Sequence, residues 1–354
     1  MENRVQGNQT VVEFLLLGFG HLPDLQPLLF LLFLMIYLAT MAGNLLIVVL
    51  VVADRHLHTP MYFFLGNLAC LEICYSSALL PRLLAGLLTG DRSVSVQGCL
   101  VQFYFFGALV GTECFLLSVM SYDRYVAICH PLRYALLMNG RFCLHLAVGS
   151  WMSGFLAMII IILSMAQLTF CGPREIDSFF CDFIPILQLS CSDLRVTKAV
   201  AFIGSSVFSA VPFVLTLTSY MCIIATILRI PSTAGKQKAF STCSSHLIVV
   251  SIYYGTLIVA YMQPNTDALR DLNKVFSVFY TVVTPLVNPL VYSLRNAEVK
   301  EALRKAQWKC VTLVSNEECR GPSRGHLVQP PVWRPENQGH PWQMIAQSLP
   351  KNLQ

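Results

Sequence analysis

Long runs of apolar, nearly uncharged residues alternate with short polar connections along most of the chain. The runs occupy residues 28–52, 60–80, 98–122, 142–168, 199–228, 239–262 and 275–294. A helix of about 20 apolar residues crosses the roughly 30 Å hydrocarbon core of a bilayer, and each run reaches that length. The pattern therefore predicts an all-α membrane protein, in which seven transmembrane helices form a bundle over residues 28–294.

Polar segments flank this predicted bundle. The N-terminal segment, residues 1–27, is expected to be extracellular. Its first 24 residues have no basic stretch followed by an apolar core, which predicts no cleaved signal peptide and a first run that serves as the signal anchor. Residues 295–310 alternate apolar and basic side chains, which predicts a short amphipathic helix on the inner membrane surface, with Cys310 either palmitoylated or unmodified. Residues 311–354 are polar and rich in Pro, Gly and Gln, which predicts a disordered cytoplasmic tail.

The composition supports a membrane protein. Of the 354 residues, 55% are hydrophobic and 12% are charged, and the mean hydropathy is +0.60. A soluble domain carries about twice that charged fraction. The net charge of +5 comes without a run rich in Lys and Arg, so we expect no nucleic-acid partner.

Charges and cysteines in the connections predict the orientation. With the N-terminus outside, the inner segments up to Lys309 contain twelve Lys and Arg residues and the outer segments contain eight, as the positive-inside rule favours. Four cysteines then lie outside, where disulfides persist, and four cysteines allow three pairings. They are Cys99, Cys171, Cys181 and Cys191. The sequon at Asn8 would also be outside, so we expect a plasma-membrane protein glycosylated there.

Two carboxylates, Glu72 and Glu113, lie deep within the runs. An ionised carboxylate at that depth must be paired or hydrated, or else take up a proton. No Lys or Arg lies at comparable depth, so the natural partner is a bound cation or a shared proton, with Asn44 and Asn288 as further oxygen ligands. The alternative is two separately protonated acids that only pack. No Cys/His spacing matches a zinc site.

The inner ends of the runs contain residues suited to a conformational switch. Asp123 and Arg124 form a charged pair at the end of the third run, although an arginine there also fits simple snorkelling to the interface. Pro289, after Asn288, frees a backbone carbonyl and weakens the seventh helix. Tyr292 is either part of this switch or an interfacial anchor. His246 is either a switch residue or a buried core histidine.

Candidate ligand-binding residues lie in the outer halves of four runs. They are Phe103, Phe106, Gly107, Val110, Ser205, Phe208, Tyr254, Leu257, Tyr261, Val278 and Thr281. These residues are mainly apolar and aromatic, as in most small-molecule pockets. An amine receptor would have a carboxylate near Phe106, whereas Glu113 lies about two turns deeper. We therefore expect neutral or weakly polar ligands. Gly107 and Gly111 also form a Gly-x-x-x-Gly pattern, which favours close helix packing.

Six motifs occur in a fixed order along residues 10–305. They are Gly43-Asn44, Pro60–Leu65, Met120–Pro131, Ser219-Tyr220, Lys238–His246 and Pro285–Tyr292. In this order and spacing they resemble the odorant receptors, a branch of the rhodopsin-like G-protein-coupled receptors. Two features depart from that family: Glu72 replaces the commoner aspartate, and the tail after Cys310 is unusually long.

The resemblance implies that an odorant binds within the bundle and activates a heterotrimeric G protein of the stimulatory olfactory type, which raises cyclic AMP. It implies a sodium-linked site at Asn44, Glu72, Glu113 and Asn288, and pairing of Cys99 with Cys181 and of Cys171 with Cys191, with Cys99–Cys191 as the rival. The switch residues that it implies are Asp123, Arg124, Tyr125, Tyr220, Lys238, His246, Asn288, Pro289 and Tyr292.

Two other classes of protein compete with a receptor. A transporter or channel would need an inverted repeat or a ring of polar residues, and the sequence shows neither. An intramembrane enzyme would need a catalytic set such as His-Glu-x-x-His, which the sequence lacks. We therefore expect a receptor, with no catalytic residues and no cofactor besides the sodium ion.

Overall fold

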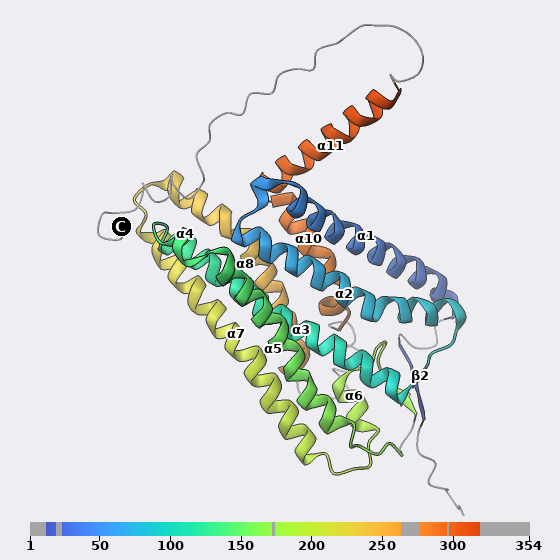
Figure 1. The fold of residues 1–354 in the computed structure, drawn as a ribbon. Coiled ribbons are helices and arrows are strands. Elements are labelled where there is room, and N and C mark those ends of the chain that lie inside the picture. Colours follow the sequence, from blue (N-terminus) through green and yellow to red (C-terminus); the bar gives the residue numbers. More distant parts are fainter. Residues whose placement is uncertain (1–11, 19–22, 172–173, 263–276, 296, 319–354) are drawn as a thin grey trace, which may run out of the picture.

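The structure is a computed structural model that describes residues 12–18, 23–171, 174–262, 277–295 and 297–318. Its long helices overlap the seven predicted runs (Figure 1). They are α1 (Gln26–Ala53), α2 (Pro60–Thr89), α3 (Val96–Cys129), α5 (Gly140–Met165), α7 (Arg195–Arg229), α8 (Thr233–Met262) and the π-helix η4 (Phe279–Val283) continued by α10 (Thr284–Arg295).

Five of these helices, α1, α2, α3, α5 and α7, are long and apolar enough to cross a membrane. Helix α8 contains a shorter apolar stretch, His246–Leu257. Together with η4 and α10 it completes the bundle in the part of the chain that the structure describes.

Local sequence signals fix several helix ends. The Ser95 hydroxyl accepts a hydrogen bond from the Gly98 N–H at 3.0 Å at the start of α3, and Asn139 caps α5 in the same way. Gly90 ends α2 with a φ of 75°, a conformation that glycine adopts without strain. Helices α2 and α3 continue to Thr89 and Cys129, beyond the predicted ends at residues 80 and 122, because the runs were defined by the absence of charge and a charged side chain such as Arg82 or Asp123 does not end a helix.

Helix α3 is the centre of the bundle and contacts α2, α5, α7 and α8. Glycines allow the backbones of α3 and α5 to approach closely: a Cβ built on Gly111 would lie 3.3 Å from the Gly154 Cα. The Gly-x-x-x-Gly pattern therefore serves close packing of α3 on α5.

One end of the bundle contains both disulfides, and we call it the disulfide end. Cys99 at the start of α3 bonds to Cys181, and Cys171 bonds to Cys191, with Cα–Cα distances of 5.4 and 6.0 Å. This is the pairing that the resemblance implied, and the rival Cys99–Cys191 bridge is not formed. The opposite end, where α3 finishes, is called the Arg124 end.

A small sheet at the disulfide end was not predicted. Strand β1 (Glu13–Leu16) pairs antiparallel with β2 (Ser93–Ser95) and parallel with β3 (Glu175–Ile176), in the order β2-β1-β3. The buried Phe14 ring packs edge-on against Phe170, 5.2 Å between centroids. The segment before α1 therefore lies across the loops that the disulfides secure.

Four short helices and one longer helix complete the described structure. The short helices are η1 (Pro23–Leu25), η2 (Arg55–Leu57), α4 (Tyr134–Leu137) and α6 (Phe183–Gln188), and the longer helix is α11 (Ala297–Glu318). Helix α11 was predicted to end at residue 310, but it continues to Glu318, so residues 311–318 are helical where a disordered tail was predicted. Val299 and Ala302 are buried against the bundle, as expected for one apolar face. Asn8 and residues 319–354 lie outside the described residues.

Candidate functional site

The candidate ligand site lies in the half of the bundle toward the disulfide end, around Phe106 of α3. Its buried ring contacts Tyr75 of α2, Phe180 of the disulfide-linked loop and Tyr280 of η4, with centroid distances of 5.4, 4.9 and 6.2 Å. The Tyr75 hydroxyl donates to the Tyr280 carbonyl at 3.3 Å. This aromatic cluster joins α2, α3, the loop and the seventh helix at one place.

Helix α8 closes against α3 through two adjacent tyrosines. The Tyr254 hydroxyl donates to the Cys114 carbonyl at 3.2 Å, and its ring packs on Phe213 of α7. The Tyr253 hydroxyl donates to the Val110 carbonyl at 2.8 Å. Since these bonds join the two helices directly, a ligand that separates α3 from α8 must break or replace them.

Of the other predicted lining residues, four have described side chains that lie within the bundle, and two have side chains that the structure does not describe. Phe208 of α7 meets Phe115 of α3 at 6.0 Å, and both Leu257 and Thr281 are buried. Val278 is half-buried and packs beside the Phe106 cluster. The side chains of Ser205 and Tyr261 lie outside the described structure.

Two residues of the predicted lining face another direction. A Cβ built on Gly107 would lie 2.7 Å from the Met158 Sδ, so Gly107 faces α5. Phe103 stacks on Phe183 of the loop helix α6, at 6.0 Å, and packs in the cluster that contains Met158. The prediction placed them in the lining because positions 103, 106, 107 and 110 share one face of the helix, and spacing alone does not show which part of that face meets the loop or α5.

At the Arg124 end, α3 holds a buried ion pair. Arg124 is 6% exposed and its Nε donates to Asp123 Oδ2 at 3.0 Å, while the Tyr134 hydroxyl of α4 donates to Asp123 Oδ1 at 2.8 Å. Burial raises the pKa of the Tyr134 hydroxyl, which keeps its proton and remains a donor. Asp123 is thus held from both sides, and Arg124 is held within the bundle.

A second polar contact joins α7 to α8 at the same end. The Tyr220 hydroxyl lies 2.5 Å from His246 Nδ1, with the two rings stacked at 5.9 Å, and both side chains are buried. His246 Nε2 and the Tyr292 hydroxyl are buried and have no hydrogen-bond partner among the described residues. Tyr125 instead contacts His130, 3.1 Å from hydroxyl to Nε2, and the side chain of Lys238 is not described.

The predicted ion-site residues meet near the middle of the bundle. Glu72 is 1% exposed, its Oε1 accepts a hydrogen bond from Asn288 Nδ2, and it lies close enough to Glu113 for their charges to interact. Glu72 Oε2 and Glu113 Oε1 have no hydrogen-bond partner in the described structure. Asn44 Nδ2 donates to the carbonyls of Thr40 and Pro285, at 3.1 and 3.2 Å. Two buried carboxylates with open oxygens supply the kind of ligand that hard cations take.

Comparison with known proteins identifies the family. The family model described as "Olfactory receptor" matches residues 33–309. Similar relatives include olfactory receptors 11A1 and 11L1 of Homo sapiens, 50% and 49% identical over 86% and 88% of this chain and 96% and 98% of theirs. Olfactory receptor 5AP2 of Mus musculus is 49% identical over 83% of this chain and 93% of its own.

This chain belongs to the olfactory receptor family. It is therefore a multi-pass membrane receptor whose partners are an odorant and a G protein, and the family is not one of enzymes. The seven-helix bundle follows from the family and from the long apolar helices together.

Sequence reasoning missed three residues in this olfactory receptor. Tyr253 and Phe115 were passed over because the prediction used only one face of each helix. On α8, Tyr253 and Tyr254 both donate hydrogen bonds to α3, and on α3 the Phe115 ring contacts Phe208. Tyr134 was missed because it binds Asp123 from a loop helix eleven residues away. The two adjacent tyrosines at 253 and 254 could have indicated that Tyr253 also contacts α3. Nothing in the local sequence indicates the contact of Tyr134 with Asp123.

Proposed function

We propose that this receptor binds small, mostly neutral, hydrophobic volatile molecules within the bundle and activates a stimulatory olfactory-type G protein, which raises cyclic AMP. The observation that carries the proposal is the position of Phe106. Its ring is buried among Tyr75, Phe180 and Tyr280, where an amine receptor would need a counter-ion. The ligand-facing groups that we assign there are aromatic rings and hydroxyls, which favour uncharged ligands.

The orientation follows from the two ends of the bundle. Disulfides persist in oxidising surroundings, which supports an orientation with the disulfide end outward at the plasma membrane. Strand β1 pairs with β2 and β3 at that end, which supports an extracellular N-terminal segment, in which the Asn8 sequon would be glycosylated. The Arg124 end then faces the cytoplasm and the G protein.

The odorant acts through its different affinity for two arrangements of the bundle. Tyr253 and Tyr254 link α8 to α3 beside the proposed pocket, and the Tyr220–His246 contact links α8 to α7 at the opposite end. Movement of α8 therefore connects ligand contacts to the cytoplasmic side. Release of Arg124 from Asp123 would then make its guanidinium available to the G protein, as the family resemblance implies.

A reporter screen tests the ligand class. Cells that express the full chain with a surface-delivery chaperone and the olfactory-type G protein would be exposed to matched neutral volatiles, amines and carboxylic acids. We expect a rise in cyclic AMP for neutral volatiles and a weakened response with Phe106→Asp, which places a charge in the aromatic cluster. A response confined to amines would contradict the uncharged pocket.

We also infer that the Glu72–Glu113 pair binds a sodium ion together with Asn288. Its support is the two open carboxylate oxygens at this buried position. Sodium chloride should raise the unfolding temperature of the purified receptor more than potassium chloride does, because an ion that binds only the folded state stabilises it. Glu72→Gln and Glu113→Gln should each remove that difference. Equal effects of the two salts on the unaltered receptor would instead support two protonated acids.

A further inference from the structure

Thr216 of α7 has a buried hydroxyl that makes no hydrogen bond in the described part of the chain. The side chain is 1% exposed, and its Oγ1 has no partner among the described residues. A buried hydroxyl in this condition destabilises the arrangement in which it occurs, because it has lost its hydrogen bonds to water and gained none. An arrangement of the bundle that supplies a partner for Thr216 is therefore stabilised relative to this one.

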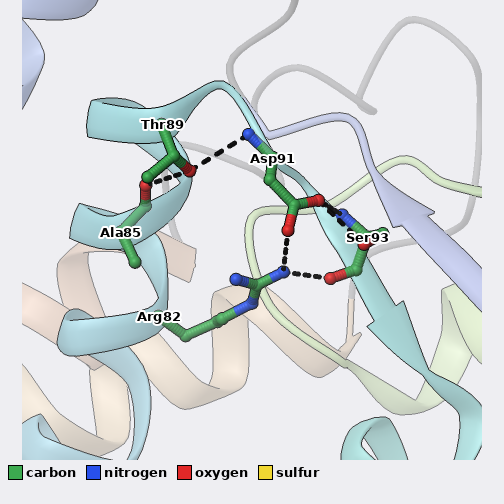
Figure 2. Close-up of polar contacts among 5 residues, drawn as sticks. All are labelled: Arg82, Ala85, Thr89, Asp91 and Ser93. Carbon is green, nitrogen blue, oxygen red and sulfur yellow. Dashed lines mark hydrogen bonds and ion pairs between the residues drawn. The ribbon is translucent and has the colours of Figure 1, made fainter.

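Several threonine hydroxyls elsewhere in the described helices bond to their own backbone. Figure 2 shows this at the end of α2, where the Thr89 hydroxyl donates to the carbonyl of Ala85, four residues earlier, at 2.8 Å. Thr218, two residues beyond Thr216 on α7, donates to the Val214 carbonyl in the same way, also at 2.8 Å. A threonine within a helix commonly makes this bond. The Thr216 hydroxyl does not make it, so that hydroxyl remains available to a neighbouring helix.

Tyr254 of α8 lies beside this hydroxyl. The hydroxyls of Tyr254 and Thr216 are close enough to interact, although they are not in hydrogen-bond geometry. The Tyr254 hydroxyl donates instead to the Cys114 carbonyl of α3 at 3.2 Å, while its ring packs on Phe213 of α7 with centroids 5.0 Å apart. Phe213 and Thr216 are three residues apart and share one face of α7. Tyr254 thus contacts α3 through its hydroxyl and the Thr216 face of α7 through its ring.

We propose that Thr216 is the second hydrogen-bond partner of Tyr254 and stabilises the odorant-favoured arrangement of the receptor. When α8 moves away from α3, the Tyr254 hydroxyl loses the Cys114 carbonyl. The Thr216 hydroxyl then binds it, because the Phe213 contact keeps the tyrosine beside α7. Thr216 gains its missing partner in the same step. This inference rests on the proposed function, since it assigns a residue to the movement of α8 that was proposed there.

This exchange gives the odorant-favoured arrangement a bond that the other arrangement lacks. Without Thr216, movement of α8 would leave the Tyr254 hydroxyl buried and unsatisfied, which opposes the movement. With Thr216, the Tyr254 hydroxyl has a partner in both arrangements. Thr216 is therefore a positioning residue, because it acts through Tyr254 and needs no contact with the odorant. One neutral hydrogen bond changes the ratio of two arrangements by about three- to tenfold.

Fluorine NMR of the purified full-length receptor in lipid nanodiscs tests this role. A trifluoromethyl-phenylalanine in place of Gln237, which is exposed near the start of α8, reports the positions of that helix without a G protein. The receptor is saturated with an odorant found active in the reporter screen. Thr216→Val should then lower the ratio of the odorant-favoured to the resting population by about three- to tenfold. Thr216→Ser, which keeps the hydroxyl, should restore most of that ratio.

The unfolding temperature without odorant separates this role from a purely structural one. Valine resembles threonine in shape, so Thr216→Val removes an unsatisfied hydroxyl from the resting arrangement and should keep or raise the unfolding temperature. A hydroxyl that served only the resting fold would lower it when removed. Thr218→Val is the matched control, because the Thr218 hydroxyl is exposed and bonded within α7. It should leave the population ratio unchanged.

A double variant makes the outcome decisive. In a Tyr254→Phe background, Thr216→Val should not lower the ratio further, because the hydroxyl that it serves is already absent. The proposal is overturned if Thr216→Val leaves the ratio unchanged, lowers it equally with Tyr254→Phe, or does not fold. It is also overturned if Thr216→Ser fails to restore the ratio. A receptor whose α8 responds to the odorant but which activates no G protein contradicts the proposed function and not this inference.

Discussion

Arg124→Ala should abolish the odorant-evoked cyclic-AMP response and leave odorant binding unchanged. Arg124 lies at the end of α3 opposite the Phe106 cluster, buried and paired with Asp123. The substitution therefore leaves the proposed ligand contacts intact while removing the group that we expect to meet the G protein. The response of surface-labelled cells should fall to that of cells without odorant, although radioligand or fluorescent odorant binding persists.

The appropriate control is Arg141→Ala. Arg141 is exposed at the start of α5, on the same side of the bundle, and its loss changes the net charge equally. Its response should stay close to that of the unaltered receptor. Removing one partner of a buried ion pair commonly costs about 3–5 kcal/mol, so each variant must be compared at equal surface density. A full response from Arg124→Ala would contradict the assigned role of this arginine.

Gly154→Val should prevent normal folding. A Cβ at this position of α5 would lie 2.7 Å from the Thr112 N and closer still to the Ala108 carbonyl, both backbone atoms of α3. Backbone atoms in a packed helix cannot move aside as a flexible side chain can, so α3 and α5 would have to separate. We expect a loss of about 3 kcal/mol or more in the free energy of unfolding, seen as lost surface expression and a lower unfolding temperature.

Gly149→Val is the matched control for this effect. Gly149 belongs to the same helix, and a Cβ there would meet nothing within 4 Å. Gly107→Ala offers an intermediate case, because its nearest contacts are the flexible end of the Met158 side chain. We expect Gly149→Val to fold, Gly107→Ala to lose a little stability and Gly154→Val to fail. Equal expression of the two valine variants would show that α3 and α5 are not in close contact.

The sequence was sufficient to predict the helices, because a bilayer requires long apolar runs and each run became a helix. It was insufficient at the helix ends, where Arg82, Asp123 and Arg124 continue a helix beyond the uncharged run. The sheet of β1, β2 and β3 was missed because strands of two to four residues are too short to show an alternating pattern. Its existence depends on contacts between distant segments.

In the candidate sites, too, the sequence predicted local pairs of residues but not contacts between distant segments. The Asp123-Arg124 pair was predicted from two adjacent letters, and the structure confirms that they form an ion pair. The third member, Tyr134, depends on how the following loop folds back, which no spacing rule supplies. Likewise, helical spacing selected Phe106 and Gly107 together, but only the structure shows that Phe106 faces the aromatic cluster and that Gly107 faces α5.

The central claim is that an odorant held in the bundle makes the Arg124 end activate a G protein. Its most direct test is guanine-nucleotide exchange by the purified stimulatory olfactory-type G protein, with the full-length receptor in nanodiscs and a neutral volatile found active in the reporter screen. We predict that the volatile accelerates exchange with the unaltered receptor and not with Arg124→Ala. Saturating odorant binding without any acceleration, with a G protein that a known receptor does activate, would contradict the account.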